Sequence, residues 1–293
     1  MGKADRIRQR NAREKIAAQQ AAARRAEARR RTFLAVGSVL AVLAVVVVLV
    51  VVKGLSKPAK AAAIVATSAS AVQREITTVP TATLNAVGKG GASPLLPTEG
   101  KQALLTSDGK PEMLYMGAEY CPYCAAERWA MVVALSKFGT FSNLHFIHSS
   151  NTDVYPSTPT LTFYGSTYTS KYLDFVPVEL YSTSEDIALQ TPTSEQSALM
   201  SKFDAPPYTN ETGSFPFVDF GNQYLIIGAQ YVPGALAHLS WGQVAADMRN
   251  PSSAVAQDID GSANSIIGAI CKITNDKPAV CSSSAAKAGE GLL

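Results

Sequence analysis

Two cysteines separated by two residues, in the run Cys121-Pro122-Tyr123-Cys124, offer the clearest chemistry in the sequence. A thiolate can attack a disulfide, and a second thiol close by can then resolve the mixed disulfide. We expect Cys121 to be the nucleophile, because a helix beginning after it would place its sulfur beside unpaired backbone N–H groups. Cys124, one turn later, is then the resolving thiol. The alternatives are a structural disulfide and a zinc site.

The segments on either side of the pair predict a strand before it and a helix after it. Residues 112–117 are a short apolar run of the kind found in buried strands. Residues 125–138 predict a helix with an apolar face, and we expect Glu127 and Arg128 to lie outside that face. Residues 144–148 predict the next strand. This strand–helix–strand context favours redox chemistry over the two alternatives.

Residues 151–213 form a stretch longer than a minimal redox domain needs, and we interpret it as an insertion. Within it we expect a hairpin made of residues 160–164 and 172–176, followed by a helix over residues 194–203. Later segments predict another hairpin and two helices, at residues 215–227, 241–249 and 254–273.

A second pair of cysteines, Cys271 and Cys281, encloses a short loop near the C-terminus. We expect a structural disulfide that joins the last long helix to the segment returning from it. The alternative is a second dithiol that passes electrons to the first. No metal is expected, because this spacing is unlike the second pair of common zinc sites, and no cofactor is expected either.

The N-terminal part of the sequence predicts a membrane anchor. Residues 33–53 are apolar up to Val52, about the twenty residues needed to cross a bilayer as one helix. Residues 1–32 carry 11 Lys/Arg and 3 Asp/Glu, which predicts a cytoplasmic N-terminus. We therefore expect an uncleaved, single-pass protein of the cell membrane with an extracytoplasmic C-terminal domain. Cleavage near the Ala-rich residues 60–63 is the alternative.

The remaining sequence divides by composition. Residues 54–97 are rich in Ala, Ser, Thr, Gly and Pro and predict a stalk or linker, part of which docks on the domain as a short strand or helix. Residues 98–281 form the expected domain, and residues 282–293 a disordered tail. Beyond the basic tail the chain holds 15 Lys/Arg and 20 Asp/Glu, with no basic patch, so nucleic acid is not an expected partner. The tail itself suits membrane lipid.

Residues 115–124 and the helix after them resemble the active-site strand and elbow of the thioredoxin superfamily. Over residues 84–281 the pattern is similar to a prokaryotic family of membrane-anchored thioredoxin-like proteins of unknown function; residues 162–166, 214–217 and 271–275 contribute to this similarity. The resemblance implies an α/β, thioredoxin-like fold with an insertion, preceded by a single transmembrane helix. It also implies a cis-proline facing the cysteine pair. We expect this to be Pro216, because Pro159 follows the preceding strand too soon to admit a helix.

These features predict a membrane-anchored thiol–disulfide oxidoreductase acting on thiols or disulfides of exported proteins, with a membrane redox partner as an option. Its site would consist of Cys121, Cys124 and Pro216. The alternative is a thioredoxin-fold binding or scaffold module in which both cysteine pairs are structural. The direction of electron flow depends on a reduction potential and is left open.

Overall fold

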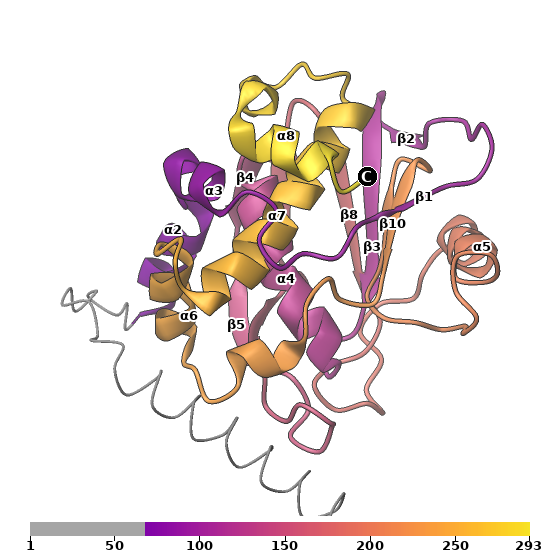
Figure 1. Cartoon of the computed structure of the whole chain (residues 1–293). Coiled ribbons are helices and arrows are strands. Elements are labelled where there is room, and N and C mark those ends of the chain that lie inside the picture. The colour runs from indigo at the N-terminus through magenta and orange to yellow at the C-terminus, as the bar shows by residue number, and fades with distance from the viewer. Residues whose placement is uncertain (1–67) are drawn as a thin grey trace, which may run out of the picture. The chain divides into compact units, whose positions relative to one another are not determined.

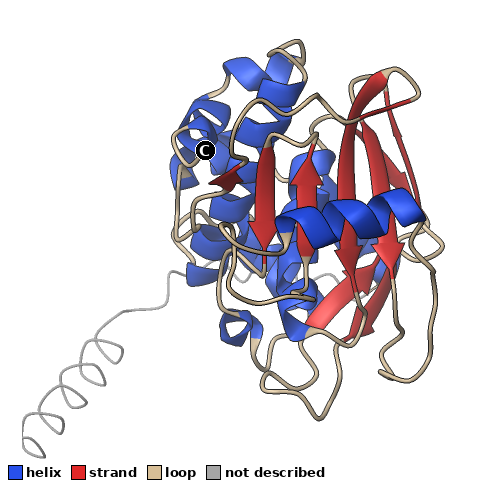
Figure 2. Cartoon of the chain, turned by 90° about the vertical axis from the view of Figure 1, so that its right-hand side faces the viewer, coloured by secondary structure: helices blue, strands red, loops and turns tan. Residues whose placement is uncertain are grey.

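The computed structural model describes residues 68–293. The basic tail, the predicted membrane span and residues 54–67 of the predicted linker lie outside the described residues. The described part has a mixed α/β fold in which a twisted sheet carries helices on both faces (Figure 1, Figure 2). Among its helices, none is both long enough and apolar enough to cross a membrane.

The central sheet is built around one buried strand. Its members are β3 (Lys110–Gly117), β8 (Asp174–Glu179), β9 (Phe217–Phe220) and β10 (Tyr224–Ile227), with the short β1 (Leu96–Pro97) and β2 (Thr106–Ser107). Strand β3 pairs in parallel with β8 and antiparallel with β9, and β10 follows β9 in a hairpin. The order across these four strands is therefore β8-β3-β9-β10. Residues 113–116 are all buried, as expected of a strand covered on both faces.

Two small antiparallel sheets accompany the central one. Strand β4 (Gly139–Ser142) pairs with β7 (Thr167–Ser170), and β5 (His145–His148) pairs with β6 (Pro159–Thr162). The predicted strand over residues 144–148 therefore exists as β5, but it is not the parallel partner of the strand before the cysteines. None of the β5 side chains is fully buried, which suits a short peripheral pair better than the centre of a sheet.

The predicted hairpin between residues 160–164 and 172–176 is wrong. Strand β6 pairs with β5, whereas β8 pairs along its whole length with β3. Phe175 and Val178 of β8 are buried, so this strand supplies core contacts. Residues 151–213 thus include a strand of the central sheet and are not an insertion throughout.

Helix positions follow the sequence expectations more closely. The helices of the domain are α4 (Pro122–Leu135), α5 (Ser194–Phe203), α6 (Trp241–Met248) and α7 (Ala254–Ile273), with the 3₁₀ helices η1 (Pro233–Leu236) and η2 (Ala279–Ser282). Helix α5 covers one face of the sheet, and α4 and α7 cover the other (Figure 1, Figure 2). Helix α4 is enclosed on all sides, so Glu127 and Arg128 are buried and not outside the apolar face as predicted.

Both ends of the described chain are folded more fully than expected. Helices α2 (Ala69–Thr77) and α3 (Thr81–Val87) occupy much of the predicted linker, and Ile76 and Leu84 are fully buried. Helix α8 (Ser284–Glu290) replaces the predicted disordered tail. It approaches α7 closely because Gly289 lies against the backbone of α7, where an added Cβ would come within 1.7 Å of a carbonyl oxygen. The buried residues of α8 are small, so the sequence of this segment shows only weak apolar periodicity.

A buried carboxyl in α7 gives the fold a predicted pH dependence. Asp260 is fully buried, and neither of its carboxyl oxygens has a hydrogen-bond partner among the described residues. Burial raises the pKa of Asp260 to about 8, although Lys137 opposes the rise. As the pH increases above the ordinary value of 3.8, the unfolded chain releases this proton before the folded chain does. The contribution of Asp260 to the free energy of unfolding should therefore fall up to about pH 8.

We expect Asp260→Asn to be more stable than the wild type at pH 8, by at least about 1.4 kcal/mol, the equivalent of one pKa unit. Near pH 4 the two proteins should differ much less. Urea unfolding of the purified full chain at both pH values checks this, with the exposed Asp186→Asn as the matched control. A stability difference that does not change with pH would contradict the role given to Asp260.

Candidate functional site

Cys121 and Cys124 lie where the central strand β3 passes into α4. Cys121 is the N-cap residue of α4, and its sulfur accepts a hydrogen bond from the Cys124 N–H at 3.3 Å. Both residues are free cysteines. Cys121 retains 7% exposure, whereas Cys124 has none, so Cys121 is the sulfur that a second molecule reaches first.

The pKa values of the two thiols are shifted in opposite directions. A hydrogen bond from the Cys124 side chain lowers the pKa of Cys121, and the backbone N–H groups of the first turn and the charge of Arg128 act the same way against burial. Burial raises the pKa of Cys124 well above its ordinary value, and the hydrogen bond to Cys121 adds to this rise. The arrangement therefore favours a thiolate at Cys121 over one at Cys124.

Phe215 and Pro216 stand in the segment that lies beside the pair. The Phe215–Pro216 peptide bond is cis, and the Phe215 carbonyl oxygen lies 3.8 Å from the Cys121 sulfur. Phe215 also packs against the small cluster formed by the two cysteines and Ala118. The competing position, Pro159, is not among the cis prolines of the described residues. It opens β6, and its carbonyl accepts a hydrogen bond from the Trp129 indole farther along α4.

Residues 100–272, more than half of the chain, match the family model described as domain of unknown function DUF929. The chain belongs to the DUF929 family. The matched residues include the cysteine pair and Pro216 but end before Cys281. No curated protein and no solved structure matches the chain.

Beneath the pair, the DUF929 chain holds a fully buried ion pair between α4 and the end of β8. The Arg128 Nε donates to Glu179 Oε1 at 2.8 Å, and Nη2 donates to Glu179 Oε2 at 2.7 Å. The same Nη2 donates to the carbonyl of Ala118, in the loop that leads to Cys121, at 2.8 Å. The Tyr115 hydroxyl lies 3.5 Å from the Glu179 carboxylate. Charge and hydrogen bonding thus connect α4, β8 and the cysteine loop.

This ion pair was not predicted from the sequence. One signal was present: Cys121, Cys124 and Arg128 are spaced by three and four residues, which places them on one stripe of a helix. Nothing in the sequence pointed to Glu179, because its strand was assigned to a hairpin elsewhere.

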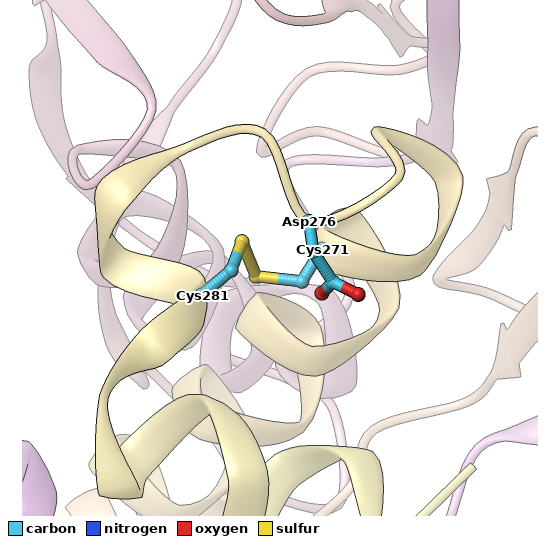
Figure 3. A group of neighbouring side chains, drawn as sticks. All are labelled: Cys271, Asp276 and Cys281. Atoms are coloured by element: carbon cyan, nitrogen blue, oxygen red, sulfur yellow. A yellow bond between two sulfur atoms is a disulfide. The ribbon is translucent and has the colours of Figure 1, made fainter.

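The second cysteine pair forms the predicted disulfide, which is thereby confirmed. Cys271 in α7 is bonded to Cys281 in η2, and both are buried (Figure 3). The Asp276 carboxylate lies close to the two sulfurs, but sulfurs bonded to each other are not free to bind a metal ion. The disulfide belongs to the large core cluster, whereas Cys121 and Cys124 belong to a separate one.

Removing this disulfide should destabilise the fold without altering the Cys121–Cys124 pair. For a sequence separation of 10, the loop-entropy relation gives about 2–3 kcal/mol. We expect the variant with both Cys271→Ala and Cys281→Ala to unfold about 5–10 °C lower, as measured by circular dichroism. Its exchange activity, measured well below that temperature, should equal the wild type. Loss of activity in the folded variant would instead favour an electron relay.

A cavity of about 660 Å³ opens beside Phe215. It lies between the ends of β3 and β8, the loop after β8, and α5. Its apolar walls include Met116, Leu180 and Met200, and Phe215, which also lines it, contacts Cys121. An apolar depression therefore lies on the other side of a residue that contacts Cys121.

Proposed function

We propose that this DUF929 protein is a membrane-anchored thiol–disulfide oxidoreductase of thioredoxin-like fold that acts on exported proteins. Cys121 forms the mixed disulfide and Cys124 resolves it. The observation that carries the proposal is the unequal environment of the two thiols: Cys121 caps a helix, retains 7% exposure and has a lowered pKa, while Cys124 is fully buried and has a raised one.

The topology supports the thioredoxin-like part of the proposal. The order β8-β3-β9-β10 combines one parallel pair with two antiparallel pairs. Along the chain, α4 and the strands β4 to β7 lie between β3 and β8, α5 lies between β8 and β9, and β9 and β10 form a hairpin. The cysteines stand at the carboxyl end of the central parallel strand, where α/β sheets place their sites. The cis Phe215–Pro216 bond directly precedes β9, and the Phe215 carbonyl lies 3.8 Å from the Cys121 sulfur.

The membrane part of the proposal rests on the sequence. The apolar residues 33–53 and the basic residues 1–32 support a single span with the domain outside. A buried disulfide at Cys271–Cys281 fits an exported domain, because such bonds persist in oxidising compartments. The partners would then be thiols or disulfides of exported proteins, together with the membrane lipid around the span.

The chemistry can be written for the reduction of a partner disulfide. The Cys121 thiolate attacks one partner sulfur, forming a mixed disulfide and releasing the other partner sulfur as a thiolate. Cys124 then loses its proton and attacks the Cys121 sulfur, so that the Cys121–Cys124 bond forms and the second partner thiolate leaves. Two electrons pass to the partner, and protons from the solvent neutralise its thiolates. Oxidation of a partner dithiol is the same sequence reversed.

Trapping of the mixed disulfide tests this proposal. Cys124→Ala leaves Cys121 able to attack but removes the thiol that releases the partner. Cells producing the full-length variant should accumulate covalent adducts with exported proteins that disappear on reduction. The matched control, Cys121→Ala, should accumulate far fewer, because its remaining thiol is buried. Absence of adducts from both variants would favour the binding-module alternative.

A further inference from the structure

Arg128 lies on the same stripe of α4 as the two cysteines, one turn beyond Cys124. The spacings of three and four residues place all three side chains on one helix face. Arg128 and Cys124 are fully buried, so no bulk water screens the charge from the sulfur. The guanidinium is therefore the cation of α4 that can act on the buried thiol.

One nitrogen of the Arg128 guanidinium has no hydrogen-bond partner among the described residues. Two of its nitrogens bind Glu179 and Ala118, but Nη1 is buried and has no hydrogen-bond partner among the described residues. A buried donor without a partner is costly, more so on a charged group. This cost is offset if the neighbouring site develops negative charge during its reaction.

Cys124 is where such a charge must form. When Cys124 attacks the mixed disulfide, or leaves the Cys121–Cys124 disulfide in the reverse direction, its sulfur carries the negative charge inside the protein. Burial opposes that charge by raising the pKa of Cys124, and Arg128 is the neighbour whose charge lowers it. The other titratable groups that interact with the sulfur are Cys121, Tyr115 of β3 and Tyr120, whereas Glu179 of β8 is paired with Arg128. Burial raises the pKa of Tyr115, so its hydroxyl is neutral.

We propose that Arg128 is a positioning residue that stabilises the buried thiolate of Cys124 in the resolving step, and that Glu179 both holds Arg128 in place and limits its effect. This inference rests on the proposed function. In the step, the proton of Cys124 leaves to solvent, and the resulting thiolate attacks the Cys121 sulfur. The bond from Cys121 to the partner sulfur breaks, and the partner leaves as a thiolate. Arg128 exchanges no atom or electron.

Substitutions of the two members of the ion pair should shift the pKa of Cys124 in opposite directions. Full-length Cys121→Ala carries a single free thiol, so its thiolate absorbance in the ultraviolet reports Cys124 alone. In that background, Arg128→Met should raise the pKa of Cys124 by about one unit or more, a tenfold loss of thiolate. Glu179→Gln should lower the pKa by a similar amount, because it leaves the cation uncompensated. Arg128→Lys should stay close to the parent.

If Arg128 and Glu179 had a purely structural role, Arg128→Met and Glu179→Gln would shift the pKa of Cys124 in the same direction, or would leave it unchanged in the folded protein. Either result would overturn the inference, with circular dichroism reporting the fold. Should Arg128→Met fail to fold, the fall expected in Glu179→Gln and the unchanged pKa expected in Arg128→Lys remain decisive. If Glu179→Gln also fails to fold, a raised pKa in Arg128→Lys overturns the inference and an unchanged one supports it. The trapping experiment retains Arg128 and Glu179, so its failure would count against the proposed function alone.

Discussion

Cys121→Ala is expected to abolish thiol–disulfide exchange by the purified protein. Cys124 remains, but it has no exposed surface, and burial raises the pKa of its thiol, so it cannot replace Cys121 as the attacking group. Reduction of a small protein disulfide in the presence of dithiothreitol should therefore proceed at the uncatalysed rate. Cys124→Ala, by contrast, should retain the first attack and lose turnover.

Reaction with iodoacetamide provides a readout that does not depend on a chosen partner. Thiolate reacts and thiol does not, so the rate should follow the titration of Cys121. Because the hydrogen bond from Cys124 and the helix N–H groups lower the pKa of Cys121, its labelling should rise with pH at values below its ordinary pKa of 9.0. Cys124 should be labelled only after denaturation. Equal labelling of both cysteines in the native protein would contradict the assignment of roles.

Arg128→Met is expected to give the largest loss of stability, about 3–5 kcal/mol. The substitution leaves the Glu179 carboxylate buried, without the two hydrogen bonds from Arg128 and without a counter-charge. It also removes the donor to Ala118, in the loop before Cys121. Urea unfolding followed by circular dichroism measures the change.

Two further variants separate loss of the ion pair from loss of packing. Combining Arg128→Met with Glu179→Leu removes both charges, so most of the lost stability should return. Lys287→Met breaks an exposed ion pair with Glu290 and should have little effect. If the double variant is less stable than Arg128→Met alone, the buried charge of Glu179 does not cause the loss of stability in Arg128→Met.

Helices were easier to predict from the sequence than strand pairing. The helix over residues 194–203 has the predicted bounds, because apolar spacing and a capping box at Thr193 and Gln196 are local signals. The helix over residues 254–273 is likewise confirmed. The strand that pairs with β3 could not be predicted in this way. Strand β8 lies more than fifty residues later, and its apolar pattern does not indicate which strand it pairs with. Helix α8 was missed because its buried residues are small alanines.

The site shows the same division between local and long-range information. Cys121 and Cys124 are close in sequence, whereas the segment beside them comes from far along the chain: the Phe215 carbonyl lies 3.8 Å from the Cys121 sulfur, and the Phe215–Pro216 bond is cis. Arg128 was assigned to the outside of its helix because charged residues are seldom fully buried. Its burial depends on Glu179, 51 residues away, which supplies the counter-charge from another strand. Contacts between residues so far apart in sequence form only in the folded chain, and they produce no periodic pattern in the sequence.

The reduction potential of the Cys121–Cys124 pair tests the redox assignment most directly. Equilibration of the purified full chain in glutathione buffers, with the dithiol and disulfide forms separated after alkylation, gives this value, and Cys271–Cys281 provides an internal structural disulfide for comparison. A redox-active pair should lie at about −270 to −120 mV, the range of known thiol–disulfide oxidoreductases. A potential below about −300 mV would mark a stable structural bond and contradict the proposed function.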